Sequence, residues 1–526
     1  MTNTLGIIRA LLIYGLCLPL AVYLGYLLAM PLDRGSLMFL AAAVMLPLIP
    51  ILLRWHHIML VMSWNMSVVL FFLPASPYLW IVMTAVSLGL TILQHILKRD
   101  VVFASVPSVT VPLLFLAAVV LITANLTGGI GLRSLGGEAY GGRRYIMILG
   151  AIAGYFALTS HRVPAGRAVT YVALYFLGSL TLIVGSIAPW MPSSLRYVYA
   201  LFPVESSEPF SGGVVGESVR LTGVTEAAVG VACFILARYG MKGLFALAER
   251  WRFLPFQFKG GFGVNQPWRV LVFLGVIWVG LMGGYRSTPI NLAIALFLLF
   301  YLEGLFRTRM LPTFLMLGIL VLAIGLPFIG NMPLMVQRSL SFLPLEINPE
   351  VRQTAEHSTE WRLKIWREVV PTIPQYLLVG KGYSIDAREL ESAKNFAEFR
   401  PDDAGFGASL ASDYHSGPLS LIIPLGAFGV IAFLWFLVAG YRLLLNNFRY
   451  GDPQHRQINT FLLAYFGTKV IFFMLVYGSF QNDLMIFTGL VALSVTINGG
   501  MRQPEAKVTA PNPAYMPFRL PKTAKV

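Results

Sequence analysis

Charged residues are scarce in this chain, and their scarcity limits the class of protein it can be. Only 12% of the 526 residues are Asp, Glu, Lys or Arg, about half the share found in soluble globular domains, whereas 57% are hydrophobic. The mean hydropathy of +0.71 is also far above the globular range. Water is therefore not the main solvent of this chain, and a membrane protein is expected.

Cysteine is almost absent. The two cysteines, Cys17 and Cys233, lie far apart inside apolar runs, so neither a disulfide framework nor a pair of thiolate metal ligands is indicated. A cleavable leader is not indicated either, because residues 1–30 hold one early cation, Arg9, and a long apolar run without a small-residue cleavage site. We expect that run to be retained as the first membrane span.

Long apolar runs are the most abundant feature of the sequence. Stretches of about 17 to 25 residues recur along nearly the whole chain, and each is long enough to cross a hydrocarbon core of about 30 Å as a helix. They predict an all-α fold, a polytopic transmembrane bundle of about 12–14 spans with one large, partly helical outer loop. The predicted spans are residues 10–30, 37–53, 58–73, 78–97, 109–127, 145–160, 168–190, 222–238, 269–285, 288–306, 310–330, 417–441, 457–479 and 483–499.

These runs divide the chain into five segments. We expect N-terminal spans and outer loops over residues 1–221, central spans that carry arginine sites over 222–330, and the large outer loop over 331–416. The C-terminal spans then occupy 417–500, and a flexible cytoplasmic tail occupies 501–526.

The excess of positive charge is concentrated between the spans. The formal net charge of +15 is compatible with nucleic-acid binding, but the cations sit mainly in short breaks between apolar runs, where the positive-inside rule puts them. With the N-terminus inside, the 39 Lys and Arg divide into 22 in inner segments, 7 in short outer loops, 9 in the long outer loop and one within a span. The comparison of 22 with 7 predicts cytoplasmic termini, and no nucleic-acid partner is expected.

Ionisable side chains are nearly absent from the predicted spans. Transporters and pumps usually place charged groups near the midplane, so their scarcity argues against a non-enzymatic polysaccharide or lipid transporter without excluding it. Lys469 is the exception, and it has three interpretations. It could snorkel to the interface, pair with Glu226 or Asp483, or contact a substrate anion.

Two arginines lie where predicted spans begin on the outer side. Arg220 follows a glycine-rich stretch, SGGVVGESVRLTGVTE (residues 211–226), and Arg286 lies in the tight junction GGYRSTPIN, directly before Ser287. A guanidinium presents a planar fork of donors that suits phosphate oxygens, and a helix that begins near Pro289 directs free amides toward the same edge. Both arginines are candidates for holding an anion, although each alone also fits an interfacial anchor.

The third unusual outer segment is the long loop over residues 331–416. Within it, STEWRLKIWREVV (358–370) places Trp361 and Ile365 on one side, which predicts an amphipathic helix on the bilayer surface or against the spans. The loop closes with His415 at the mouth of the next span. Imidazole suits proton transfer near neutral pH, although a lone interfacial histidine is more often a polar anchor.

At these places the sequence resembles the O-antigen ligase and O-antigen polymerase superfamily, bacterial membrane glycosyltransferases that use polyprenyl-diphosphate-linked glycans. Members carry an Arg-x-x-Gly element at an outer loop, which RLTG at Arg220 matches. They also carry a Ser-Arg-like junction between spans, which YRST at Arg286 matches with Tyr285 in place of the serine.

The large loop of the family is similar as well. It has an Arg and Trp helix, a Gly-x-Gly turn and a closing histidine, commonly followed by Asn. WRLKIW (361–366), GKG (380–382) and DYHSG (413–417) look like these elements, with Ser416 in place of the usual Asn. The resemblance is concentrated between about Arg220 and Phe433.

The resemblance implies a transferase at the periplasmic face of a bacterial inner membrane. It would move a glycan from an undecaprenyl-diphosphate carrier to an acceptor hydroxyl, with membrane lipids as its surroundings. An O-antigen ligase-like reaction with lipid A-core as the acceptor is the first expectation. An O-antigen or exopolysaccharide polymerase and a protein oligosaccharyltransferase remain open, because the motifs are shared by all three.

The implied chemistry is metal-independent, inverting and free of any cofactor. The adjacent Asp402 and Asp403 do not change this expectation, because neighbouring side chains of an extended segment project apart and a solvated loop explains them. Arg220 and Arg286 are expected to hold the diphosphate, and His415 to accept the hydroxyl proton or to hydrogen-bond the phosphate. Further substrate-binding candidates are Arg362, Lys381, Lys469 and Ser287.

Overall fold

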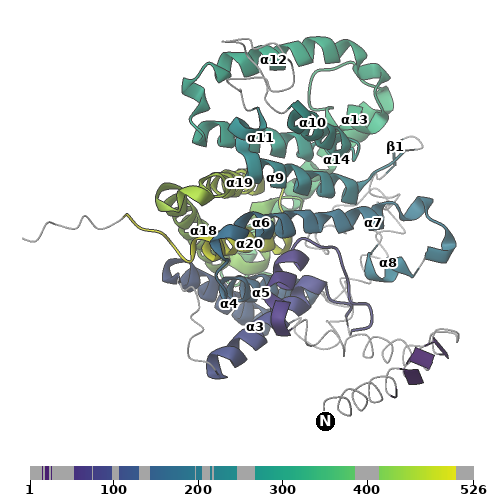
Figure 1. The fold of residues 1–526 in the computed structure, drawn as a ribbon. Helices are drawn as coiled ribbons and strands as arrows, with labels where there is room; N and C mark the ends of the chain where they lie inside the picture. The colour runs from purple at the N-terminus through teal and green to yellow at the C-terminus, as the bar shows by residue number, and fades with distance from the viewer. Residues whose placement is uncertain are drawn as a thin grey trace, which may run out of the picture.

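Most of the predicted apolar runs form packed helices in the computed structural model (Figure 1). The structure describes residues 53–73, 75–97, 106–128, 142–195, 197–203, 214–215, 218–245, 267–384 and 414–504, together with seven positions between 15 and 26. Most of the predicted span 10–30 and nearly all of 37–53 therefore lie outside the described residues, as do Asp402, Asp403 and most of the tail.

Seven helical segments of the described part are long and apolar enough to cross a membrane. They are α3 (Leu79–Leu97), α4 (Pro107–Thr127), α6 to α7 (Ala168–Ser186), α9 (Thr222–Leu244), α18 (Gly417–Tyr450), η10 with α19 (Pro453–Leu475) and α20 (Phe480–Asn498). Three shorter apolar helices are α10 (Pro267–Leu281), α11 (Ser287–Leu302) and α12 (Met310–Gly325). The expected fold class, an all-α multi-pass membrane protein, is confirmed.

Short elements connect these helices. The segment from 165 to 201 consists of η2 (Ala165–Arg167), α6 (Ala168–Leu177), η3 (Gly178–Thr181), α7 (Leu182–Ser186), η4 (Ala188–Trp190), η5 (Ser193–Leu195) and α8 (Val198–Leu201). Farther along lie the two-residue strands β1 (Val214–Val215) and β2 (Ser218–Val219), then η7 (Leu305–Arg307), η8 (Leu326–Asn331), η10 (Pro453–His455) and α19 proper (Arg456–Leu475).

One predicted span is not a continuous helix. The run 58–73 was expected to be helical throughout, but the helix covers 53–63, and Val69 pairs with Tyr78 in an isolated antiparallel bridge. The non-helical backbone is satisfied by neighbours, because the Ser67 amide donates to Thr181 Oγ1 at 3.1 Å and the Val69 amide to the Leu201 carbonyl at 2.8 Å. Irregular backbone at membrane depth is tolerated where protein covers it, which hydropathy alone does not register.

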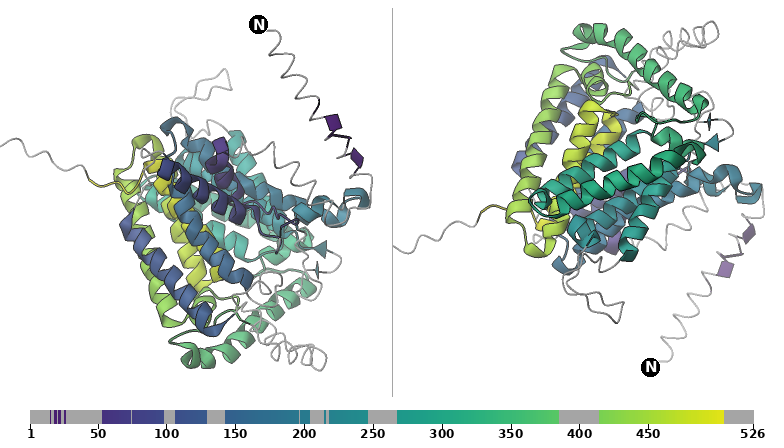
Figure 2. Two further views of the ribbon diagram at one scale, coloured as in Figure 1. Left: turned by 90° about the horizontal axis from the view of Figure 1, so that it is seen from below. Right: turned by 90° about the horizontal axis from the view of Figure 1, so that it is seen from above.

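The core forms where helices from both halves of the chain meet. Helix α20 packs along α5 (Gly142–Thr159), and α18 packs along α4 and α19. In Figure 2 the yellow C-terminal helices lie among the blue helices of the first half. The buried rings of Phe433, Phe473 and Phe487 meet edge to face at centroid distances of 5.3–6.1 Å, a geometry favourable for aromatic pairs.

A neutral polar network joins the last three spans at the end of the bundle where α18 stops. Asn459 Nδ2 donates to the Asn447 carbonyl at 3.0 Å, and the side chains of Asn459 and Asn498 exchange two hydrogen bonds of 3.0 and 2.8 Å. Asn447 Nδ2 donates to Ser494 Oγ at 3.0 Å. We call these four residues the asparagine network. It satisfies buried amides within the protein.

The predicted amphipathic helix exists and is longer than expected. Helix α14 spans Pro349–Val369, begins with Asn348 accepting a hydrogen bond from the Glu350 amide at 2.8 Å, and leads into η9 (Val370–Thr372) and α15 (Ile373–Tyr376). Its buried Val351 packs near α13 (Leu334–Ser339), and its buried Ile365 packs against the start of α18. Both ends of α14 are thus held to the bundle, at one edge of it in Figure 2.

Candidate active site

Arg220 is positioned by the close contact between the backbones of α7 and α9. The hairpin of β1 and β2 ends one residue before Arg220, and α9 begins at Thr222. Gly223 lies so close to α7 that an added Cβ would collide with the Leu182 carbonyl oxygen, and the Gly223 amide donates to Ser186 Oγ at 2.7 Å. The Arg-x-x-Gly pattern therefore has a physical cause, since only glycine permits this contact beside Arg220.

Arg286 lies at a junction that a second element fixes. The turn between α10 and α11 passes through Gly284, whose φ of +74° favours glycine, and an added Cβ would lie 2.7 Å from Met335 Sδ. The buried Arg338 donates from Nη1 to the Gly284 carbonyl at 2.9 Å, and Ser339 Oγ donates to the Leu281 carbonyl at 2.8 Å. Helix α13 thus holds the turn that presents Arg286.

The two arginines are joined through Tyr285 and α14. The Arg220 guanidinium lies over the Tyr285 ring, 5.6 Å from its centroid, and the Tyr285 hydroxyl hydrogen-bonds Thr222 Oγ1. Arg286 Nη1 donates to Thr359 Oγ1 on α14 at 3.1 Å. Three segments that lie far apart in the sequence therefore meet here.

The electrostatic interactions among the arginines also indicate that Arg220, Arg286 and Arg362 lie close together. Burial lowers the pKa of the Arg220 guanidinium, Tyr285 acts in the opposite direction, and the positive charge of Arg362 lowers it further. Burial also lowers the pKa of Arg286, followed by the charges of Arg362 and Arg220. Arginine is not deprotonated in proteins near neutral pH, so Arg220 and Arg286 stay cationic despite the lowered pKa. Three like charges held this close favour an anionic ligand.

His415 lies between two aromatic rings at the same end of the bundle. Its ring centroid is 4.9 Å from that of Trp361 on α14 and 5.6 Å from that of Tyr477, which follows α19. Its φ of +47° belongs to the left-handed region, which costs a non-glycine residue about 1–3 kcal/mol and must be imposed by the surroundings. The Arg362 guanidinium also lies over Tyr477, 5.8 Å from the ring centroid.

Contacts therefore link all four groups. Arg220 contacts Tyr285, the neighbouring Arg286 contacts α14, and α14 contacts His415 through Trp361. We call Arg220, Arg286, Arg362 and His415 the arginine site. It lies where α9, α11 and α18 begin, at the opposite end of the bundle from the asparagine network. The structure brings these predicted residues together, while their chemical roles remain predictions.

Lys381 belongs to a turn that docks on the kink of α18. Its amide donates to the Ile423 carbonyl at 2.7 Å, and the neighbouring Gly380 has a φ of +84° and packs against Pro424. Helix α18 bends there, because Gly426 has a φ of +64° inside the helix. The Gly-x-Gly turn thus has a structural function, and the proposed substrate contact of Lys381 stays a prediction.

Lys469 lies within α19 and interacts with groups of the bundle. Its ammonium is 5.4 Å from the Tyr465 ring centroid and 5.9 Å from that of Phe472, and it is within electrostatic range of Asp483. These surroundings favour the internal interpretation over substrate binding. Ser287 is the first residue of α11 beside Arg286, and its substrate contact also stays a prediction.

Sequence reasoning missed several neighbours. Tyr285 was noted only as a departure from the family serine, and Trp361 only as part of an apolar face and of the Arg and Trp helix. Tyr477 and Thr359 were not singled out. An aromatic residue at the outer end of a span was the available signal for Tyr477. The buried Arg338 was counted only as a loop cation, since its carbonyl partner depends on tertiary structure.

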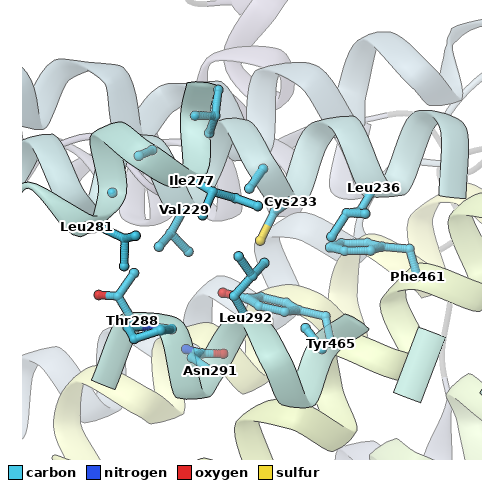
Figure 3. Close-up of a pocket in the computed structure, with 16 residues that line it drawn as sticks. Val229, Cys233, Leu236, Ile277, Leu281, Thr288, Asn291, Leu292, Phe461 and Tyr465 are labelled. Carbon is cyan, nitrogen blue, oxygen red and sulfur yellow. The ribbon is translucent and has the colours of Figure 1, made fainter. Parts of the chain in front are cut away.

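A narrow apolar crevice lies beside the arginine site, between α9, α10, α11 and α19. Figure 3 shows Cys233, Ile277, Leu292 and Tyr465 facing one another across it. Its volume of about 40 Å³ is far below the roughly 300 Å³ at which ligand pockets begin. The crevice is therefore a packing gap between spans and is too small for an isoprenoid chain.

The described residues contain no group of three or more His, Cys, Asp or Glu side chains able to hold a metal ion. Asp402 and Asp403 are not among the described residues.

Comparison with known proteins agrees with the expected family. Residues 269–434, about a third of the chain, match the family model described as O-antigen ligase. No curated protein matches the chain. The matched segment runs from α10 into α18 and includes Arg286, Arg362 and His415, whereas Arg220 precedes it. The chain is thus a multi-pass membrane protein whose residues 269–434 are similar to the O-antigen ligase family.

Proposed function

We propose that this protein transfers a glycan from an undecaprenyl-diphosphate carrier to an acceptor hydroxyl at the periplasmic face of the inner membrane, with lipid A-core as the acceptor. The observation that carries the proposal is the convergence of three guanidinium groups from separate segments beside His415. A dianionic diphosphate would satisfy that concentration of positive charge. The Lys and Arg distribution of 22 inner against 7 short-loop outer cations supports the periplasmic orientation.

The proposed reaction is a single displacement. The acceptor oxygen bonds to the anomeric carbon of the first sugar while the bond from that carbon to the diphosphate oxygen breaks, and the configuration inverts. The electron pair of the broken bond leaves with undecaprenyl diphosphate, whose growing negative charge Arg220 and Arg286 stabilise. His415 takes the proton from the acceptor hydroxyl.

The test is glycan transfer in vitro with purified full-length protein, lipid-linked donor and lipid A-core. Arg286→Ala should lower kcat by about 100- to 1,000-fold, because an electrostatic donor of this kind contributes about 3 kcal/mol to the transition state. His415→Ala should cost about 100-fold or more. The matched control is Arg309→Ala, an exposed arginine before α12. Wild-type rates in both site variants would remove this mechanism.

The acceptor is tested in the native host. After deletion of the gene, loss of long glycan chains from lipid A-core with accumulation of lipid-linked polymer is the expected result. Accumulation of single lipid-linked repeats would instead assign the protein to polymerisation and overturn the proposed acceptor.

A further inference from the structure

A polar cleft lies on the side of Arg286 that faces the middle of α14. Its volume is about 300 Å³, which is within the range of sites that bind small molecules. One wall is the segment between α13 and α14, and the other is the face of α14 ahead of Trp361. The lining residues are Arg286, Ser341, Leu343, Pro344, Arg352, Ala355, Glu356, Thr359 and Glu360.

Two of the charged side chains that line the cleft are fixed by hydrogen bonds within the protein. Arg286 donates to Thr359 Oγ1 at 3.1 Å, and Arg352 Nη2 donates to the Leu345 carbonyl at 2.6 Å. Ser341 also lines the cleft, and its hydroxyl oxygen is buried with no hydrogen-bond partner among the described residues.

The two glutamates decide what kind of occupant fits. Glu356 and Glu360 are one helical turn apart, so their carboxylates lie on the same face of α14. Ionised carboxylates only accept hydrogen bonds, and they repel phosphate groups. A neutral molecule rich in hydroxyl groups satisfies them, while the guanidinium groups donate to its oxygens. Sugars have this combination of donors and acceptors.

We propose that this cleft is a sugar subsite, in which hydroxyl groups of one sugar residue donate to Glu356 and Glu360. The subsite rests on the proposed function, because its occupant is a sugar of a reacting glycan. Arg286 would then border both the diphosphate and the sugar and fix their relative position. The sugar comes from either the transferred glycan or the acceptor, since the cleft borders the arginine site and both substrates must approach it.

The experiment measures steady-state transfer by full-length E356Q/E360Q, with donor and acceptor varied separately. Glutamine keeps the shape but exchanges part of the acceptor capacity for donors, and hydrogen bonds to charged groups justify an expected 10- to 100-fold rise in one KM. The kcat should stay within about twofold. A rise in the acceptor KM assigns the subsite to the acceptor, and a rise in the donor KM assigns it to the transferred glycan.

Two further variants keep the result interpretable. Glu368→Gln lies on the same helix outside the cleft and should leave both KM values unchanged. Glu356→Asp keeps the carboxylate and should raise the affected KM less than Glu356→Gln does. Unchanged KM values in E356Q/E360Q, or a loss of kcat alone, would overturn the subsite while the proposed function stands. Absence of transfer by the wild-type protein would instead overturn the proposed function itself.

Discussion

The two ends of the bundle bury polar groups in opposite ways. In the asparagine network, neutral amide and hydroxyl groups pair with one another at 2.8–3.0 Å across α18, α19 and α20. In the arginine site, like charges converge, the buried Nε of Arg220 has no hydrogen-bond partner among the described residues, and His415 has a left-handed backbone. A self-satisfied network stabilises the fold, whereas a group of converging cations is suited to an anionic ligand.

The largest expected effect concerns the side of the membrane that each end of the bundle faces. The contrast between the two ends requires that they face different compartments. Glu350→Cys at the start of α14 and Gln454→Cys in η10 place single reporters at exposed polar positions. With Cys17 replaced by serine and the buried Cys233 left in place, a membrane-impermeant maleimide should label Glu350→Cys from the periplasm.

The Gln454→Cys reporter should react only after the inner membrane is permeabilised. The effect is all or none, because a charged reagent does not cross the bilayer. Labelling of both reporters from the same side would contradict the proposed orientation.

A smaller effect tests how rigidly the arginine site is held. Gly284→Ala should lower the transfer rate by more than tenfold, because a Cβ at a φ of +74° and 2.7 Å from Met335 Sδ shifts the turn that presents Arg286. Gly275→Ala in the preceding helix α10 is the control, since its added Cβ meets nothing within 4 Å. Transfer rates are compared between preparations of the two variants that have the same Tm, so that a difference in rate does not reflect a difference in stability. Equal activity of both variants would show that the turn need not be rigid.

The same contrast explains how much the sequence could predict. Long apolar runs predicted most helices to within a few residues, because a span must satisfy its own backbone in lipid. Helix α18 extends to Tyr450, nine residues past the predicted end at 441, because it continues beyond its apolar run to Asn447 and the asparagine network. The break at Ser63 was not predictable, since the groups that satisfy it come from 181 and 201.

For the candidate site, sequence reasoning supplied the cations and the histidine but not their neighbours. Arg220, Arg286 and His415 were recognised from charge topology and family resemblance, which depend on residue identity and order. Tyr477 and Thr359 were missed because a ring under a guanidinium or a hydroxyl on a helix has no sequence signature. The polar cleft was missed for the same reason, since it requires the segment at 341–344 to face α14.

The smallest predicted effect concerns the asparagine network. Asn459→Ala removes the donor to the Asn447 carbonyl and both side-chain bonds to Asn498, so it should cost about 1–3 kcal/mol of stability, measured as a lower Tm in detergent. Transfer per folded molecule should be unchanged, because these residues lie at the opposite end from Arg286. Asn446→Ala, a neighbour whose replacement touches none of these bonds, controls for the substitution itself. If Asn459→Ala instead abolished transfer at full stability, the two ends would be coupled, and the division between a structural network and a ligand site would be wrong.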